Sequence, residues 1–502
     1  MTRKPRAQGG VRQAERADRA VIDIGSNTVR LVVYSGPRRT PNVWLNEKVT
    51  ARLGKDLSTT GKLPAKSIEM ALDGLARFTT ILKDLEIADV QCVATAAVRE
   101  AKNGPQFLKQ VENFGLEPRL LSGEEEANIS AMGVIGAFPG AKGIVTDLGG
   151  GSLELVAIGE GTCHHGISTP LGTLRLPALR EGGERAFRKA INKELSAAGW
   201  AEGYEGPLYL VGGTWRALAA YAMHRADYPL TDPHAYRLSN ADGEKVAKKL
   251  SQMAPEKLAN IPGISSSRAA GLPDAAAMLR VLLSTLKPDG LVISGWGLRE
   301  GLLFERLEPA AREQDPLITA VTHFATPRGA SLNHATMIAG WTSRVVTPNG
   351  RGTERLRLAA ILLAMAQVRI EPNMRLKHSF EWAVDKRWPG LGHNGRALIG
   401  MALRGACSKP EPPEELLQLA SDEELREAAS WGLAFRLCRR IGAGSRASML
   451  TSRLSREDGK LVLWLDESRA NLASELVIED LRILANWLGC EPELRLGDPA
   501  QH

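Results

Sequence analysis

The chain has 502 residues, of which 43% are hydrophobic and 24% charged, and its formal net charge is +7. This length exceeds what one hydrophobic core supports, so we expect several domains, and the composition excludes a mainly disordered chain. No apolar run is long enough to span a bilayer, residues 1–20 lack the apolar segment of a secretory signal, and the five cysteines are scattered. Together these features predict a cytoplasmic protein without a membrane partner.

The basic arm over residues 1–19 is expected to be a solvated tail, with attraction of a polyanion as the alternative. An apolar hairpin is expected over 20–34, then a strand near 43–49 and a helix over 63–85, where apolar residues recur with a helical period. The next expected elements are a strand over 90–96, a helix over 105–114, a strand over 119–121 and a helix that Ser122 caps. This alternation predicts the α/β class.

The hairpin motif occurs twice: Asp23-Ile24-Gly25-Ser26-Asn27-Thr28 returns 124 residues later as Asp147-Leu148-Gly149-Gly150-Gly151-Ser152. In both copies an apolar strand leads through an Asp and a Gly-rich turn into a second apolar strand. The repeat predicts two similar half-domains, 20–138 and 139–308, that face each other across a cleft. The expected elements of the second are a hairpin over 143–158, a loop over 168–173, a strand over 207–211, a helix from Pro273, a strand over 290–294 and a loop over 295–301.

The character of the chain changes after residue 308. Residues 309–450 are rich in Leu, Ala and Arg with helical periodicity and little strand signal, which predicts a separate helical domain. Residues 451–502 predict a small α+β segment, with a strand over 460–466 and a helix over 474–488.

Gly-rich turns that follow apolar strands can hold phosphate oxygens, because glycine leaves the backbone N–H groups bare. A third such turn, Gly212-Gly213-Thr214, follows the strand over 207–211. The alternative is that each turn needs glycine only to adopt a positive φ. Asp147, at a strand end beside its turn, is the best candidate ligand for Mg²⁺, and Glu154 lies across the same hairpin.

Other charged residues have two competing interpretations. The run Glu124-Glu125-Glu126 at a helix start would ordinarily interact with the helix dipole and solvent. Arg30 and Arg99 follow a turn and a strand end, where each guanidinium could reach a phosphate or form a surface ion pair.

Six stretches resemble, in the same order, the exopolyphosphatase / guanosine pentaphosphate phosphohydrolase (Ppx/GppA) family of the sugar kinase–heat-shock–actin superfold. They are residues 23–28, 94–103, 122–127, 147–154, 212–216 and 294–301. The resemblance implies an α/β fold with two ribonuclease-H-like (actin-like) half-domains around a cleft, followed by an all-α HD-like domain. It also implies hydrolysis of a terminal phosphoanhydride, on inorganic polyphosphate or guanosine pentaphosphate, with Mg²⁺ as cofactor.

Carried over residue by residue, the resemblance places the catalytic glutamate on Glu126, as the general base for the attacking water. It places the metal-binding pair on Asp147 and Glu154. The candidate phosphate-binding residues, from the turns and from the resemblance together, are Asp23, Ser26, Asn27, Arg30, Thr95, Arg99, Gly149, Gly150, Gly151, Ser152, Gly212, Gly213 and Thr214. Longer family members pair, so a homodimer is expected, with no specific nucleic-acid partner.

The helical region resembles the extra domain of longer family members, but the helix expected to carry an HD-type His-Asp pair reads Leu362-Leu363-Ala364-Met365-Ala366-Gln367. We therefore expect no metal among His334, His378 and His393, and a structural or ligand-shaping role. The region is rich in arginine, which favours a polyanionic substrate, with a solvated basic face as the alternative. These arginines are Arg328, Arg344, Arg351, Arg355, Arg369, Arg375, Arg387, Arg396 and Arg404.

Polyphosphate hydrolysis is thus the predicted function, with guanosine pentaphosphate hydrolysis as its alternative. A kinase of the same superfold would need an adenosine pocket, and the Glu126 motif argues against it. A non-catalytic sensor of polyphosphate or an alarmone would release no phosphate. Chain-length and metal preference, and inhibition by guanosine tetraphosphate, are left open by the sequence.

Overall fold

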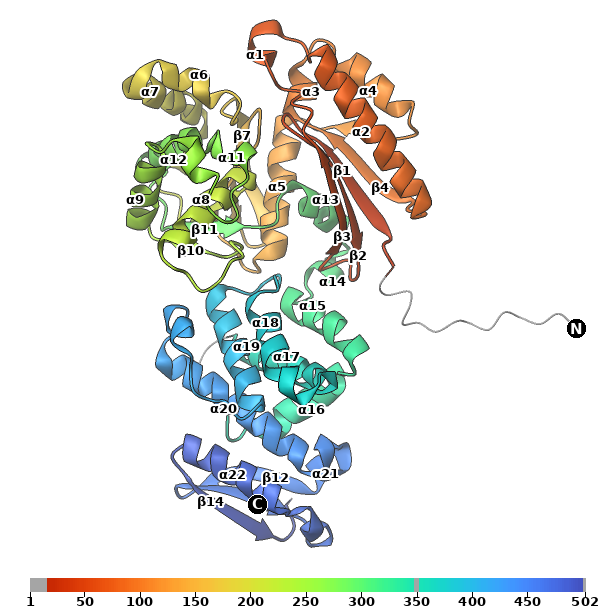
Figure 1. Cartoon of the computed structure of the whole chain (residues 1–502), viewed down its shortest axis with the longest axis vertical. Helices are drawn as coiled ribbons and strands as arrows, with labels where there is room; N and C mark the ends of the chain where they lie inside the picture. The colour runs from red at the N-terminus through yellow and green to blue at the C-terminus, as the bar shows by residue number, and fades with distance from the viewer. Residues whose placement is uncertain (1–15, 347–351, 500–502) are drawn as a thin grey trace, which may run out of the picture. The chain divides into compact units, whose positions relative to one another are not determined.

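The computed structural model describes residues 16–346 and 352–499, which form two compact units that divide after Pro316 (Figure 1). Unit one holds two β-sheets with helices packed on them, and unit two is mainly helical with one small sheet. None of the helices within the described ranges combines the length and apolar character that a membrane span needs. The α/β class and the helical C-terminal region predicted from the sequence are confirmed.

The first sheet of unit one has the strand order β3-β2-β1-β4-β5. Neighbours β1, β2 and β3 are antiparallel, whereas β4 is parallel to β1 and β5 to β4. The strands are β1 (Arg19–Ile24), β2 (Val29–Ser35), β3 (Asn42–Val49), β4 (Asp89–Ala94) and β5 (Pro118–Leu120). The helices of this part are α1 (Leu57–Thr60), α2 (Ala65–Asp84), α3 (Ala96–Glu100), α4 (Gly104–Glu112) and α5 (Gly123–Ala137).

The second sheet repeats this plan in the order β10-β11-β9-β6-β7-β8, with β6, β7 and β8 antiparallel and β9 and β11 parallel to β6. The strands are β6 (Gly143–Leu148), β7 (Leu153–Gly159), β8 (Thr162–Thr169), β9 (Leu208–Val211), β10 (Arg237–Leu238) and β11 (Leu291–Ser294). The helices are α6 (Leu176–Glu181), α7 (Gly183–Leu195), η1 (Ser196–Ala201), α8 (Gly213–Arg225), α9 (Asn240–Leu250), α10 (Pro255–Leu258), α11 (Ser266–Ala269), α12 (Leu272–Leu286), α13 (Leu298–Glu305) and α14 (Pro309–Arg312).

Helix α5 lies between the two sheets (Figure 1). Successive residues of a strand point to opposite faces, so Ile22 packs with Phe78 of α2 while Val21 packs with α5 and α13. The other side of α5 packs on the second sheet. Helices α5 and α13 approach so closely that a Cβ built on Gly301 would lie 1.8 Å from the carbonyl oxygen of Ile129. This contact sets the position of α5 and α13 relative to each other.

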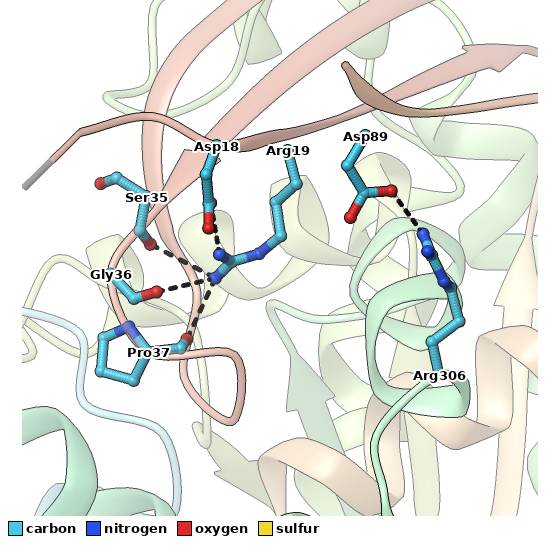
Figure 2. A network of polar contacts seen from close by, with 7 residues as sticks. All are labelled: Asp18, Arg19, Ser35, Gly36, Pro37, Asp89 and Arg306. Atoms are coloured by element: carbon cyan, nitrogen blue, oxygen red, sulfur yellow. Dashed lines mark hydrogen bonds and ion pairs between the residues drawn. The ribbon is translucent and has the colours of Figure 1, made fainter. Parts of the chain in front are cut away.

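A buried arginine fixes the start of β1 (Figure 2). Arg19 is only 3% exposed, and its guanidinium pairs with Asp18 and donates to the carbonyls of Gly36 and Pro37, each at 3.1 Å. Burial lowers the pKa of Arg19, and the ion pair with Asp18 opposes this effect. The basic arm predicted over 1–19 falls largely on residues 1–15, which lie outside the described ranges, whereas its last residue belongs to β1.

Unit two begins with helices and ends with a three-stranded sheet of order β12-β13-β14. Its helices are α15 (Pro316–Ala325), η2 (Thr326–Arg328), α16 (Leu332–Thr342), α17 (Thr353–Ala366), η3 (Gln367–Arg369), α18 (Pro372–Val384), α19 (His393–Ala406), η4 (Glu414–Gln418), α20 (Asp422–Arg440), η5 (Gly442–Gly444), α21 (Arg446–Leu450), η6 (Glu467–Leu472) and α22 (Glu475–Trp487). The strands are β12 (Ser452–Glu457), β13 (Lys460–Leu465) and β14 (Glu491–Leu496).

The observed elements differ from the predicted ones in two ways. The region 295–301, predicted to be a loop, contains the first turn of α13, and the loop predicted over 168–173 includes the end of β8. Strands β8, β10, β12 and β14 were not predicted. All four lie at sheet edges, where half-exposed strands lose the apolar pattern.

Candidate active site

A cleft of about 580 Å³ lies within unit one, where the Gly-rich turns of the two half-domains meet. Residues from both sheets and from α5, α8 and α13 line it. Every predicted site residue except Arg99 lies in this lining. They are Asp23, Ser26, Asn27, Arg30, Thr95, Glu126, Asp147, Gly149, Gly150, Gly151, Ser152, Glu154, Gly212, Gly213 and Thr214.

The two repeated turns have the same hydrogen-bond geometry. The Gly25 N–H donates to the Thr28 carbonyl, and the Gly149 N–H donates to the Ser152 carbonyl, each at 3.0 Å. Asp23 stands opposite Arg30 in the first hairpin, and residue 147 stands opposite residue 154 in the second. The sequence repeat is therefore also a structural repeat.

The turns approach each other closely, and glycine is what permits this. A Cβ built on Gly151 would lie 2.7 Å from the hydroxyl of Ser26, and one built on Gly150 would lie 3.0 Å from the Ser26 Cβ. Behind the second turn, the Thr173 and Leu174 N–H groups donate to its carbonyls at 3.0 and 2.9 Å. The second turn is thus held from both sides.

Glu126 is the one glutamate of the acidic run that lines the cleft. Glu125 instead caps α5, because its carboxylate accepts from the Ser122 N–H at 2.8 Å while Ser122 Oγ accepts from the Glu125 N–H at 3.1 Å. Glu124 is exposed. The ordinary first-turn role predicted as the alternative therefore holds for Glu124 and Glu125 and not for Glu126.

Arg99 lies behind Glu126 and orients it. Its Nη1 donates to Glu126 Oε2 at 3.0 Å and to the Leu121 carbonyl at 2.7 Å. Burial raises the pKa of Glu126 to about 7, against the opposing effect of Arg99 and with a further rise from Asp147. A carboxyl with a pKa near neutrality is suited to accept a proton during catalysis.

Two buried acids from β6 and β7 lie beside Glu126. Ser130 on α5 donates to Asp147 Oδ2, and Ser168 on β8 donates to Glu154 Oε1 at 2.9 Å. Burial raises the pKa of both carboxyls, and repulsion from Glu126 and Asp147 raises that of Glu154 further. Ser130 thus orients Asp147, and Ser168 together with Ser152 orients Glu154.

These acids fit a magnesium ion that shares its ligands with substrate. Mg²⁺ is usually held by one or two protein carboxylates together with phosphate oxygens and waters. Asp147 and Glu154 stand opposite each other across one hairpin, and a cation would relieve the repulsion between their buried charges. Within the described ranges, no cluster of three or more His, Cys, Asp or Glu side chains could hold a metal by protein ligands alone.

Three arginines in the lining of the cleft interact with one another and form what we call the cationic wall: Arg30, Arg268 and Arg299. Burial and repulsion from Arg299 lower the pKa of both Arg30 and Arg268. Arg299 is buried too, but Glu300 and Asp23 raise its pKa above the ordinary value. Such mutual repulsion is relieved when a polyanion binds.

Glycines in the third turn bring backbone close to these charged groups. Gly212 has a φ of +113°, and a Cβ there would lie 2.8 Å from the Leu148 carbonyl oxygen. A Cβ on Gly213 would lie 2.7 Å from the guanidinium of Arg268. The positive φ that was predicted as the alternative role is therefore observed at Gly212, and Gly213 leaves room for the guanidinium of Arg268, whereas phosphate binding by this turn stays a prediction.

Sequence reasoning missed Arg268 and Arg299. Arg299 belongs to a stretch that the family resemblance used, but it was expected in a loop rather than on the first turn of a helix. Arg268 follows a run of serines in a polar segment, and nothing in its spacing signals that α11 directs it to the cleft.

The profile of the Ppx/GppA phosphatase family matches residues 32–310, which is more than half of the chain. The chain belongs to the Ppx/GppA phosphatase family. This confirms the predicted family, the actin-like fold of its N-terminal region and the class of reaction, hydrolysis of a phosphoanhydride. The match ends within unit one, so unit two lies outside it.

Relatives of this Ppx/GppA protein match over the same region. Exopolyphosphatase 1 of Mycobacterium leprae is 29% identical over 306 residues, which cover 58% of this chain and 90% of that protein. The crystal structure of the Aquifex aeolicus Ppx/GppA member shares 27% identity with a TM-score of 0.50, covering 57% of this chain and 96% of that one. A crystal structure of an exopolyphosphatase from Cytophaga hutchinsonii, at 23% identity, shares the fold with a TM-score of 0.52 over 58% of this chain and 98% of that one.

Proposed function

We propose that the protein is an exopolyphosphatase that removes the terminal phosphate of inorganic polyphosphate as orthophosphate. Glu126 carries the proposal, because it is a largely buried carboxylate with a pKa of about 7 in the cleft where the two Gly-rich turns meet. The hydrolase class supports it, and the M. leprae relative bears the name of this activity.

In the proposed reaction, Glu126 takes a proton from a water molecule as the water oxygen attacks the terminal phosphorus. The bond from that phosphorus to the bridging oxygen breaks, and the shortened chain leaves with the electron pair. Backbone N–H groups of the Gly-rich turns and the cationic wall offset the negative charge of the substrate oxygens. Mg²⁺ bound by Asp147 and Glu154 would add charge neutralisation at the phosphate.

Polyphosphate is favoured over guanosine pentaphosphate by the lining of the cleft. None of the described residues that line it is aromatic, so the cleft offers no ring on which a guanine base could stack. Seven cationic side chains line it instead, and those are Arg30, Lys48, Arg52, Lys55, Arg216, Arg268 and Arg299. A chain of phosphates can use every one of these charges.

The arginines of unit two do not supply the support that the sequence suggested. Several donate to backbone carbonyls: Arg328 to Phe324 at 2.7 Å, Arg355 to Gly390 at 3.0 Å and Arg396 to Val384 at 3.1 Å. Arg396 is fully buried. These side chains hold helices and loops together, and Arg351 lies outside the described residues. The substrate preference therefore rests on the cleft.

The test is phosphate release from long-chain polyphosphate and from guanosine pentaphosphate, each with Mg²⁺ and without ATP. We expect faster release from polyphosphate per enzyme molecule. Faster release from guanosine pentaphosphate would reverse the substrate assignment within the same reaction class. No release from either substrate by folded protein would leave a phosphate-binding sensor as the function.

We further propose a cytoplasmic homodimer. The scattered free cysteines, and the lack of a membrane-spanning helix in the described ranges, support the location. Light scattering coupled to gel filtration tests the assembly, because a mass near twice the 54.2 kDa of one chain is the expected result.

A further inference from the structure

A buried histidine outside the cleft contacts the backbone that forms one of its walls. His234 is 0% exposed, and its ring packs against Phe138 with the centroids 4.9 Å apart. Its Nδ1 accepts a hydrogen bond from the Gly295 N–H at 3.0 Å. Because Nδ1 is the acceptor, the neutral ring carries its proton on Nε2.

The histidine is itself held firmly. The next residue, Ala235, has a φ of +67°, which a non-glycine residue adopts only where the surroundings hold it there. Two backbone hydrogen bonds do so: the Ala235 N–H donates to the Ile293 carbonyl at 2.8 Å, and the Ile293 N–H donates to the Tyr236 carbonyl at 3.0 Å. His234 is thus fixed against the end of β11. Gly295, whose N–H it accepts from, is the first residue after this strand.

The segment that His234 holds borders the catalytic carboxylates. A Cβ built on Gly297 would lie 2.5 Å from Val211 Cγ1 and 3.7 Å from Asp147 Oδ2, so this backbone packs tightly on Val211 and lies close to Asp147. The Gly297 N–H donates to Glu300 Oε2 at 3.1 Å, and the Tyr34 hydroxyl donates to Glu300 Oε1 at 3.0 Å. The segment is therefore fixed at Gly295 by His234 and at Gly297 by the first turn of α13.

Helix α13 starts directly after this segment and presents Arg299 to the cleft. Arg299 interacts electrostatically with Asp23 and Asp147, which belong to different half-domains. We infer that His234 is a positioning residue: through its hydrogen bond with the Gly295 N–H it sets the position of Arg299 and of the backbone segment 295–297 beside Asp147. The inference rests on the proposed hydrolysis, in which Arg299 contacts the phosphate chain.

Three variants test the inference. His234→Phe keeps a ring against Phe138 but removes the acceptor, whereas His234→Asn keeps an acceptor near the Nδ1 position and removes the ring. Tyr209→Leu is the matched control, because Tyr209 packs against the same Phe138, with centroids 5.4 Å apart, whereas the Gly295 N–H donates to His234. Thermal unfolding first establishes that each variant is folded.

Steady-state kinetics on long-chain polyphosphate with Mg²⁺ then separate positioning from packing. For His234→Phe we expect KM to rise about tenfold or more with a smaller change in kcat, since a misplaced Arg299 weakens phosphate binding in both ground and transition states. His234→Asn should restore KM to within about threefold of wild type, and Tyr209→Leu should leave it unchanged. An unchanged KM in His234→Phe, or equal increases in all three variants, would overturn the inference.

Two further measurements keep this test apart from that of the proposed function. Hydrogen exchange of the Gly295 amide should speed up in His234→Phe and stay slow in Tyr209→Leu; equal exchange rates would refute the contact. If the wild type releases no phosphate, the proposed function fails. The dissociation constant for tripolyphosphate, measured by calorimetry, then takes the place of KM, and the inference stands only if His234→Phe weakens it and His234→Asn restores it.

Discussion

Replacing Glu126 by Gln removes one proton acceptor from the cleft and leaves the shape of the side chain almost unchanged. The amide oxygen of Gln can still accept from Arg99, whose Nη1 lies 3.0 Å from the carboxylate, so the side chain should stay in place. Loss of a general base typically lowers a rate by about 10²–10⁴-fold, which corresponds to roughly 2.7–5.5 kcal/mol in the activation free energy. We therefore expect kcat to fall at least ~10²-fold with KM little changed.

The assay is phosphate release from polyphosphate with saturating Mg²⁺. Glu124→Gln is the control, because it makes the same chemical change on the same helical turn at an exposed position. It should retain wild-type kcat. If Glu126→Gln kept more than about a tenth of wild-type kcat, the assignment of the base would be refuted.

The same substitution makes a prediction about pH. The pKa of Glu126 is raised from 4.5 to about 7, so kcat/KM of the wild type should rise with pH up to about 7. In Glu126→Gln this rise of kcat/KM with pH should be absent. A raised carboxyl pKa also means that the native state loses stability as pH rises from 4.5 through 7. At 1.36 kcal/mol per pKa unit, Glu126→Gln should be more stable than wild type by up to ~3 kcal/mol at pH 8 without metal, and equal to it below pH 4.5. If wild type and Glu126→Gln had equal melting temperatures at pH 8 as well as below pH 4.5, the raised pKa of Glu126 would be contradicted.

Three other predictions concern the metal pair and two glycines. Asp147→Asn should raise the Mg²⁺ concentration needed for half-maximal activity by ~10-fold or more, and a magnesium titration that matched wild type would exclude this residue as a ligand. Gly301→Ala should lower the free energy of unfolding by more than ~2 kcal/mol, because its Cβ would lie 1.8 Å from a backbone oxygen. Gly340→Ala is the control: its Cβ would meet nothing within 4 Å in a helix, so it should not destabilise the protein. Denaturant titration measures both free energies. Gly213→Ala should displace the guanidinium of Arg268 and raise KM for polyphosphate with unfolding unaffected, and an unchanged KM would remove that arginine from the binding site.

The hairpins and buried strands of unit one could be predicted because their signals are local. Strands β1 and β6 are apolar and lead into an Asp and a glycine, and Ser122 caps α5 as expected. Strand β8 could not be predicted, since Thr162–Thr169 is largely exposed at the edge of its sheet and its polar residues resemble a loop. Strand β14 could not be predicted either, because it is also largely exposed at a sheet edge.

Within the site, the turns and the three acids could be predicted because their spacing repeats or matches a family motif. Arg268 and Arg299 could not be predicted from spacing, since α11 and α13 bring them to the cleft by tertiary packing alone. The position of Arg99 behind Glu126, outside the lining of the cleft, is likewise a tertiary feature. Its predicted phosphate contact stays a prediction.

The structural repeat places opposite charges at equivalent positions. Asp23 faces a cation, Arg30, across the first hairpin, whereas Asp147 faces a second acid, Glu154, across the other. The two hairpins therefore match in backbone and differ in charge, which gives the cleft a direction. A linear polyanion has no polarity of its own, but here only the end that lies against the acidic hairpin would meet the acids and Glu126. Its remaining phosphates would lie along the cationic side chains of the lining, and the protein would shorten such a chain from one end.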